Sequence, residues 1–159
     1  IGIKSILIIM RTGVKVGDAM TQNPVIVSMD RTVSYASKIM LEKRVGSLLV
    51  MEWDKIKGII TEKDIVRVIA KGMSPRRVKI PEVMRKKLHT TKPDEDLYEA
   101  VRHMKKNKVR RLPVVYRGKL VGLLTHTDIL RLEPILYEMM YDWANMSLSK
   151  NQMKKDIEE

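Results

Sequence analysis

The sequence contains no cysteine and no phenylalanine, and aromatic residues make up only 4% of it. The absence of cysteine excludes disulfide bonds, thiolate metal sites and a cysteine nucleophile, and it is typical of proteins in a reducing compartment. Because aromatic side chains are so few, the core must be built from aliphatic residues and from the 12 methionines.

Long apolar segments are also missing. The most apolar stretch, "IGIKSILIIM" at residues 1–10, contains a lysine, and it is too short for a membrane helix, which needs roughly 20 residues. It also lacks the basic region and the cleavage site of a signal peptide. We therefore predict a cytoplasmic protein without membrane segments, in which residues 1–13 pack on the domain or on a partner.

Acidic residues are scarce relative to basic ones. The chain has 19 aspartates and glutamates against 31 lysines and arginines, which gives a net charge of +12. Such an excess favours anionic partners through long-range electrostatics. The basic residues gather in "RKK" at residues 85–87 and in "KKNKVRR" at residues 105–111. Composition alone leaves open whether these clusters form a solvated face or bind anions.

The chain of 159 residues contains an internal repeat. When residues 14–67 are set against residues 78–131 without a gap, 15 of the 54 positions are identical. Ordinary residue frequencies would give about three identities by chance. The length suits one compact domain or two small ones, and the repeat indicates that it arose by duplication.

Each copy has the pattern of a β-α-β-β-α unit. A short lead-in ("VGDAM" or "IPEVM") and an extended segment ("NPVIV" in the first copy) precede an amphipathic helix. Two aliphatic runs then form a predicted hairpin, and a second helix ends the unit. The fold class is therefore α/β of the α+β type. Since a unit of about 55 residues buries little surface alone, we expect the copies to pack with pseudo-twofold symmetry.

The predicted boundaries are residues 14–72 and 78–133 for the two repeats and residues 73–77 for the linker between them. Residues 134–159 form a C-terminal helix and tail, because Leu136, Met139, Met140, Trp143 and Met146 follow helical spacing. This helix either covers the repeats or a dimer mate, or it offers a methionine-rich stripe to a partner.

One motif recurs at the start of the last helix of each copy: "GIITEKD" at residues 58–64 and "GLLTHTD" at residues 122–128. Threonine is a good N-cap and an acid in the first turn favours the helix dipole, so capping alone explains the motif. The same geometry presents free N–H groups and a hydroxyl that suit a phosphate. An aspartate one turn into the helix can also accept hydrogen bonds from sugar hydroxyls.

The duplicated unit, the "PDEDLYEA" segment, the "VRRLPVV" strand and the recurring "G-h-h-T-x-x-D" motif resemble a tandem pair of CBS domains, also called a Bateman module. The resemblance covers roughly residues 14–131. It implies a non-catalytic regulatory module that binds an adenine nucleotide (AMP, ADP or ATP) in clefts between the repeats and signals to a partner. It also implies a homodimer, and S-adenosylmethionine or NADH are further candidate ligands.

The resemblance assigns roles in two pockets. In the main pocket Asp128 would hold the ribose, Thr125 the ribose or phosphate, and two arginines the phosphate. The residues of this pocket are Thr21, Asn23, Pro24, Val25, Gly46, Ser47, Arg110, Arg111, Leu123, Thr125 and Asp128. The second pocket would comprise Ile59, Thr61, Asp64, Arg85 and His89.

The two pockets are expected to differ in strength. The main pocket, at Asp128, has the small polar segment "TQNPV" to frame a base, whereas the second pocket, at Asp64, has "RKKLH" at the equivalent position. We therefore predict that the Asp128 pocket is the better adenine site. The Asp64 pocket is expected to be empty, weak, or more tolerant of additional phosphates because of Arg85.

Other functions have less support in the sequence. The three histidines (His89, His103 and His126) form no convincing metal-ligand set, so no metal is predicted. No P-loop and no catalytic arrangement of side chains can be singled out, which favours a protein that is not an enzyme. The alternatives that remain are a basic nucleic-acid-binding protein and a structural dimerisation module whose Thr/Asp pairs only cap helices.

Overall fold

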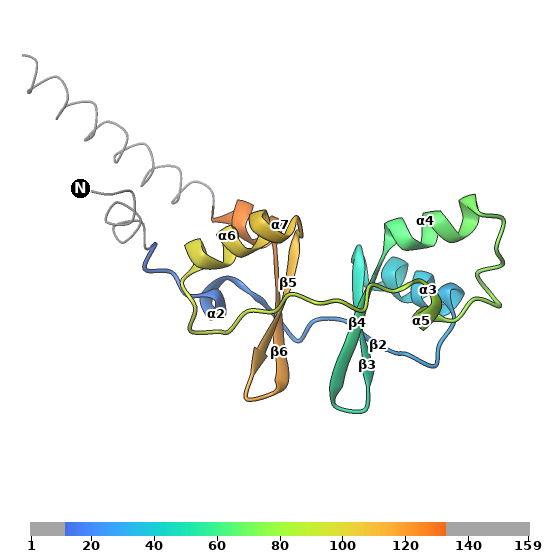
Figure 1. Cartoon of the computed structure of the whole chain (residues 1–159), viewed down its shortest axis with the longest axis horizontal. Helices are drawn as coiled ribbons and strands as arrows, with labels where there is room; N and C mark the ends of the chain where they lie inside the picture. The colour runs from blue at the N-terminus through green and yellow to red at the C-terminus, as the bar shows by residue number, and fades with distance from the viewer. Residues whose placement is uncertain (1–11, 133–159) are drawn as a thin grey trace, which may run out of the picture.

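The computed structural model describes residues 12–132 (Figure 1). The predicted C-terminal helix and residues 1–11 of the N-terminal segment lie outside the described residues. The elements in chain order are α2 (Val16–Ala19), β1 (Thr21–Gln22), β2 (Ile26–Ser28), α3 (Val33–Lys43), β3 (Ser47–Glu52), β4 (Lys55–Thr61), α4 (Glu62–Ala70), α5 (Ile80–Val83), α6 (Leu97–Asn107), β5 (Arg111–Tyr116), β6 (Lys119–Thr125) and α7 (His126–Arg131). None of these helices has the length and apolarity that crossing a membrane requires.

The strands form two small sheets that lie side by side, with the helices on their outer sides (Figure 1). In the first sheet β3 lies between β2, which is parallel to it, and β4, which is antiparallel. In the second sheet β6 lies between β1 and β5, both antiparallel to it. This mixture of helices and strands confirms the predicted α+β class.

The two hairpins confirm the predicted repeat in detail. β3–β4 and β5–β6 have the same pairing, and both shift register at the equivalent position, after Val50 and after Val114. The copies differ before the first helix. Where the first copy has strand β2, the second has an isolated parallel bridge between Thr91 and Val114.

The hydrophobic core is divided into three clusters. Two of them lie behind the sheets, and each contains residues from both repeats. Ile80 and Met84, from the lead-in of the second repeat, are buried in the core of the first repeat. Val16, from the lead-in of the first repeat, is buried with Leu97 in the core of the second. The third cluster (Leu49, Ile59 and Leu123) lies between the two sheets. The repeats have therefore exchanged their lead-ins.

Close packing against two glycines fixes the exchanged lead-ins. A Cβ atom added to Gly58 would lie 2.7 Å from Sδ of Met84 and 2.8 Å from the carbonyl oxygen of Arg85. At the equivalent site, Gly122 faces the side chain of Met20 and the backbone of Thr21. Only glycine lets the backbones approach this closely, which explains why the motif begins with glycine in both copies.

Asp96 provides a polar anchor for the first lead-in. Its carboxylate accepts hydrogen bonds from the backbone N–H groups of Thr12 (3.3 Å), Gly13 (3.2 Å) and Tyr98 (2.9 Å), and from the Thr12 hydroxyl (3.1 Å). Burial raises the pKa of Asp96, but these hydrogen bonds to the charged form lower it more, so the net pKa lies below 3.8. The same side chain caps α6.

We predict that Gly58→Ala lowers the free energy of unfolding by about 1–3 kcal/mol, because the added methyl group overlaps a backbone oxygen that cannot move freely. Urea unfolding followed by circular dichroism measures the change. Gly46→Ala is the control, since its methyl group would meet mainly the flexible end of Glu62, at 3.2 Å. Equal stability of the two variants would contradict this packing argument.

We predict that Asp96→Asn makes the free energy of unfolding depend less on pH in the acidic range. The pKa of Asp96 is lower in the folded chain than in the unfolded one. The carboxylate therefore stabilises the fold fully above about pH 4 and loses this contribution as the pH falls through the folded pKa. At pH 7 the variant should lose about 1 kcal/mol, and the difference from wild type should shrink toward pH 3. Urea unfolding at several pH values tests this; a constant difference would contradict it.

Candidate functional site

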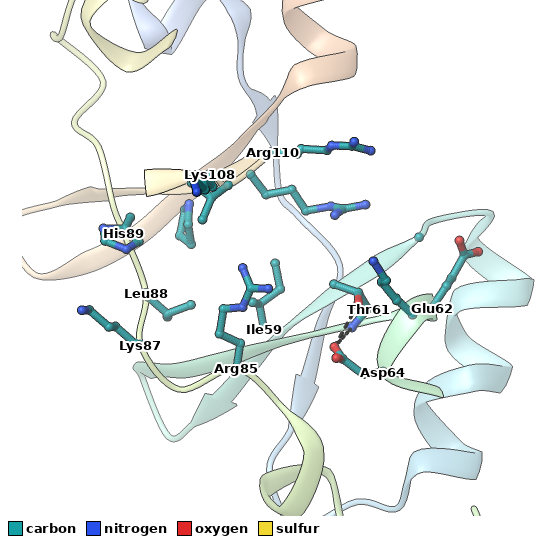
Figure 2. Close-up of a pocket in the computed structure, with 15 residues that line it drawn as sticks. Ile59, Thr61, Glu62, Asp64, Arg85, Lys87, Leu88, His89, Lys108 and Arg110 are labelled. Carbon is teal, nitrogen blue, oxygen red and sulfur yellow. Dashed lines mark hydrogen bonds between the residues drawn. The ribbon is translucent and has the colours of Figure 1, made fainter. Parts of the chain in front are cut away.

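A cavity of about 460 Å³ opens between the two repeats (Figure 2). It is lined by Gly46 and by three longer segments, residues 59–64, 85–89 and 108–113, which meet near the junction of β4 and α4. The lining residues are Gly46, Ile59, Thr61, Glu62, Lys63, Asp64, Arg85, Lys87, Leu88, His89, Lys108, Val109, Arg110, Arg111 and Pro113. Figure 2 shows Thr61 and Asp64 at one end of the cavity and His89 at the other.

The exchanged lead-in forms one wall of the cavity. The backbone of Arg85 pairs with that of Ile59 through two hydrogen bonds, of 3.0 and 2.9 Å. This pairing holds the chain after α5 against the edge of β4. The following residues, including Lys87 and His89, therefore run along the cavity (Figure 2).

Asp64 is held rigidly at the start of α4. Its side chain is buried, and its Oδ2 accepts hydrogen bonds from the backbone N–H of Thr61 (2.8 Å) and from the Thr61 hydroxyl (2.9 Å). Its Oδ1 accepts a hydrogen bond from Nη1 of Arg67 at 2.9 Å. A carboxylate oxygen has two lone pairs, so Oδ1 retains capacity to accept from a ligand hydroxyl. Thr61 and Thr125 are the N-cap residues of α4 and α7, and the predicted hydrogen bond to the cap hydroxyl forms at Thr125, which accepts from the backbone N–H of Asp128 at 3.2 Å.

Arg111 carries its charge where solvent is limited, since the residue is half-buried. Burial lowers the pKa of its guanidinium below the usual value, the carboxylates of Glu62 and Asp64 raise it, and the charges of Arg110 and Arg85 lower it. The two carboxylates do not cancel the other effects, and the net pKa is lowered. A bound anion at this end of the cavity would relieve the repulsion between the arginines.

The Asp128 side has the same frame with different side chains. Oδ2 of Asp128 accepts from the backbone N–H and the hydroxyl of Thr125, both at 2.8 Å. The hydroxyl of Thr21 donates to Oδ1 at 3.3 Å, and Arg131 lies 3.9 Å from the same oxygen. Pairing of β1 with β6 places Thr21 opposite Leu123. These predicted neighbours therefore do meet, and Asn23, Pro24 and Val25 follow β1 directly.

The assignment of Arg110 and Arg111 to the Asp128 pocket is wrong, because both residues line the Asp64 cavity. The carbonyl of Arg110 accepts from the backbone N–H of His126 at the start of α7, but the side chain extends toward the other repeat (Figure 2). The sequence alone could not show to which side of the interface these side chains turn.

Gly46 also lies elsewhere than predicted, whereas the predicted role of Ser47 stays a prediction. Gly46 lines the Asp64 cavity, and its carbonyl accepts from the N–H of Glu62 at 3.1 Å. Ser47 is buried and pairs with Thr61 in the β3–β4 ladder. Both positions are fixed by the sheet of their own repeat.

All five residues predicted for the second pocket (Ile59, Thr61, Asp64, Arg85 and His89) line the cavity together. Their role in binding a nucleotide stays a prediction. Sequence reasoning missed seven lining residues: Glu62, Lys63, Lys87, Leu88, Lys108, Val109 and Pro113. The signal for two of them was present, since Lys87 and Lys108 belong to the basic clusters noted above.

A metal centre finds no support in residues 12–132. No three histidine, aspartate or glutamate side chains in this part of the chain are grouped so that they could hold a metal ion. His89 and His103 do pack edge to face, with ring centroids 6.0 Å apart.

The sequence matches the CBS domain family twice, over residues 16–71 and 80–134. These matches cover more than half of the chain, and the chain belongs to the CBS-domain family as a tandem pair. Such a pair is a regulatory module typical of signal-transduction proteins.

Known proteins with similar pairs support this classification. An uncharacterized protein of Methanopyrus kandleri is 36% identical over 126 residues, which cover 77% of this chain and 64% of the relative. This chain thus spans less than two thirds of that relative's length. The structure of an uncharacterized conserved protein from Pyrococcus horikoshii is similar, with a TM-score of 0.71 and 28% identity over 78% of this chain and 95% of that chain. A hexameric CBS-CP12 protein from bloom-forming cyanobacteria gives a TM-score of 0.67 and 34% identity, over 74% of this chain and 69% of that chain.

Proposed function

We propose that this CBS pair binds an adenine nucleotide in the Asp64 cavity and reports the occupancy to a protein partner. The observation that supports this most is the combination, in one cavity between the repeats, of a buried carboxylate and a surrounding set of basic side chains. The volume of about 460 Å³ lies within the usual range of small-molecule sites. The protein is not proposed to catalyse a reaction.

Each part of a nucleotide has a candidate partner in this cavity. Oδ1 of Asp64 is available to the ribose hydroxyls, and Thr61 lies beside it. Ile59 and Leu88 belong to the apolar cluster between the sheets and supply a surface against which a base can pack. The arginines of the cavity, Arg110 among them, suit the phosphates because a guanidinium donates in a planar fork.

This proposal changes the order of the two pockets. The Asp128 pocket, with Thr21, Asn23, Pro24, Val25, Leu123 and Thr125, becomes the second and weaker candidate for an adenine ligand. Without Arg110 and Arg111 it loses the phosphate-binding side chains that had favoured it. AMP, ADP and ATP are the expected ligands of the Asp64 cavity, and S-adenosylmethionine and NADH belong in the same ligand screen.

Regulation would follow from the position of the cavity between the repeats. A nucleotide that contacts both repeats stabilises one relative orientation over others, and this shift in population is the signal. We expect the module to work in the cytoplasm as a homodimer in which the shift passes to the partner. The hexameric relative supports assembly of CBS pairs, although its oligomeric state differs from the dimer proposed here.

We predict that Asp64→Asn weakens binding of ADP and ATP by about tenfold or more, since a hydrogen bond to a charged group contributes about 1.5–3 kcal/mol. The N-cap residue Thr61 is unchanged, and asparagine keeps a side-chain oxygen that can accept from the backbone N–H of Thr61, so the fold should persist. Isothermal titration calorimetry measures the affinities, and Asp128→Asn, which alters the same motif in the other repeat, should change them less than threefold. A larger loss for Asp128→Asn would restore the original order of the pockets.

The nucleic-acid alternative is tested in the same experiment by adding single-stranded oligonucleotides and varying salt. Binding through a phosphate backbone weakens steeply with added salt, whereas a nucleotide enclosed by Asp64 and the sheets should be less sensitive. If oligonucleotides bind tightly and no mononucleotide does, the proposed function is wrong. If no ligand binds, the module is structural.

A further inference from the structure

The Asp64 cavity holds an unusual concentration of positive charge. Six of its lining residues are basic: Lys63, Arg85, Lys87, Lys108, Arg110 and Arg111. Within residues 12–132, none of these six side chains forms a salt bridge. All are exposed except Arg111, which is half-buried. Like charges gathered around one cavity repel each other unless an anion lies between them.

The acidic residues of the cavity do not balance this charge. Asp64 already pairs with Arg67 outside the cavity at 2.9 Å. Glu62 is the other acid, and its carboxylate and the guanidinium of Arg111 lie near the same point, 3.2 and 3.5 Å from a Cβ built on Gly46. Glu62 therefore offsets Arg111 at most, and the remaining cations have no carboxylate partner in the described part of the chain.

Each of these six basic residues has a counterpart in the other repeat, which provides an internal comparison. Shifted by 64 residues, Arg85 corresponds to Thr21, Lys87 to Asn23, Arg110 to Gly46, Arg111 to Ser47 and Lys63 to Thr127. Only Lys108 keeps its charge, in Arg44. The hairpin and the two longer helices of the unit form in both copies although five of these six cations have uncharged counterparts, so these elements do not need the charges for folding. We therefore attribute these positive charges to the ligand that the Asp64 cavity binds.

We propose that the Asp64 cavity selects its nucleotide by the number of phosphates and takes a nucleoside triphosphate in preference to a monophosphate. This inference rests on the proposed function, because it assumes that Asp64 holds the ribose. One phosphate of AMP can contact two or three of the cations. The other cations come from different segments: Lys87 follows α5, and Lys108 and Arg110 precede β5. Only a longer chain of phosphates would contact these cations at the same time.

Lys108 and Arg110 are the specificity-determining pair in this account. Both are exposed side chains that lie between α6 and β5, and both line the cavity. Each charge is individually weak in solvent, but a polyphosphate engages them together, and its own charge increases with each phosphate. Their contribution should therefore be large for ATP and small for AMP.

Isothermal titration calorimetry with adenosine, AMP, ADP and ATP tests this inference, at physiological salt and with EDTA so that the phosphates carry their full charge. We expect the affinity to rise about fivefold to tenfold with each added phosphate, so that ATP binds roughly 25-fold to 100-fold more tightly than AMP. The double variant Lys108→Gln/Arg110→Gln should weaken ATP binding by about tenfold or more and AMP binding by less than threefold.

The matched control is Lys105→Gln/Lys106→Gln, which removes the same charge from the exposed end of α6 outside the cavity lining. It should leave the ratio of ATP to AMP affinity within threefold of wild type. Equal affinities of wild type for AMP and ATP, or equal losses in the two double variants, would overturn the selection by phosphate number while leaving nucleotide binding intact. Absence of binding by any adenosine ligand would instead contradict the proposed function.

Discussion

The exchange of lead-ins between the repeats is the constraint on which the rest of the structure depends. Each lead-in buries apolar residues in the core of the other repeat, Val16 in one direction and Ile80 in the other. Each also passes over a glycine, Gly58 or Gly122, so closely that no side chain fits between the backbones. Two units that each bury little surface alone are thereby joined through shared cores.

The same constraint creates the candidate site. Because the backbone of Arg85 is hydrogen-bonded to Ile59, the segment that follows α5 is held beside the end of β4 and the start of α4. The capped helix start with Asp64 then faces a wall from the other repeat. Divergence of the two copies on this shared frame placed six basic residues around the Asp64 cavity, and five of these have uncharged counterparts in the other repeat.

Local features of the fold were predictable from the sequence, whereas features that depend on which repeat a side chain turns toward were not. The hairpins, the capped helices and the pairing of Thr61 with Asp64 follow from periodicity and from short-range chemistry, and the structure confirms them. The positions of Arg110 and Gly46 were assigned to the wrong cavity. The repeat offset fixes equivalent residues but does not show that the lead-ins exchange, which is a long-range consequence of packing Met20 and Met84.

The central claim is that the basic cavity at Asp64 is a nucleotide site, and a crystal structure of the protein grown with ATP tests it most directly. The account predicts electron density for one nucleotide between the repeats, with a ribose hydroxyl within hydrogen-bond distance of the Asp64 carboxylate and the phosphates against Lys108 and Arg110. A nucleotide bound beside Asp128 with the Asp64 cavity unoccupied, or phosphates directed away from these basic side chains, would contradict it.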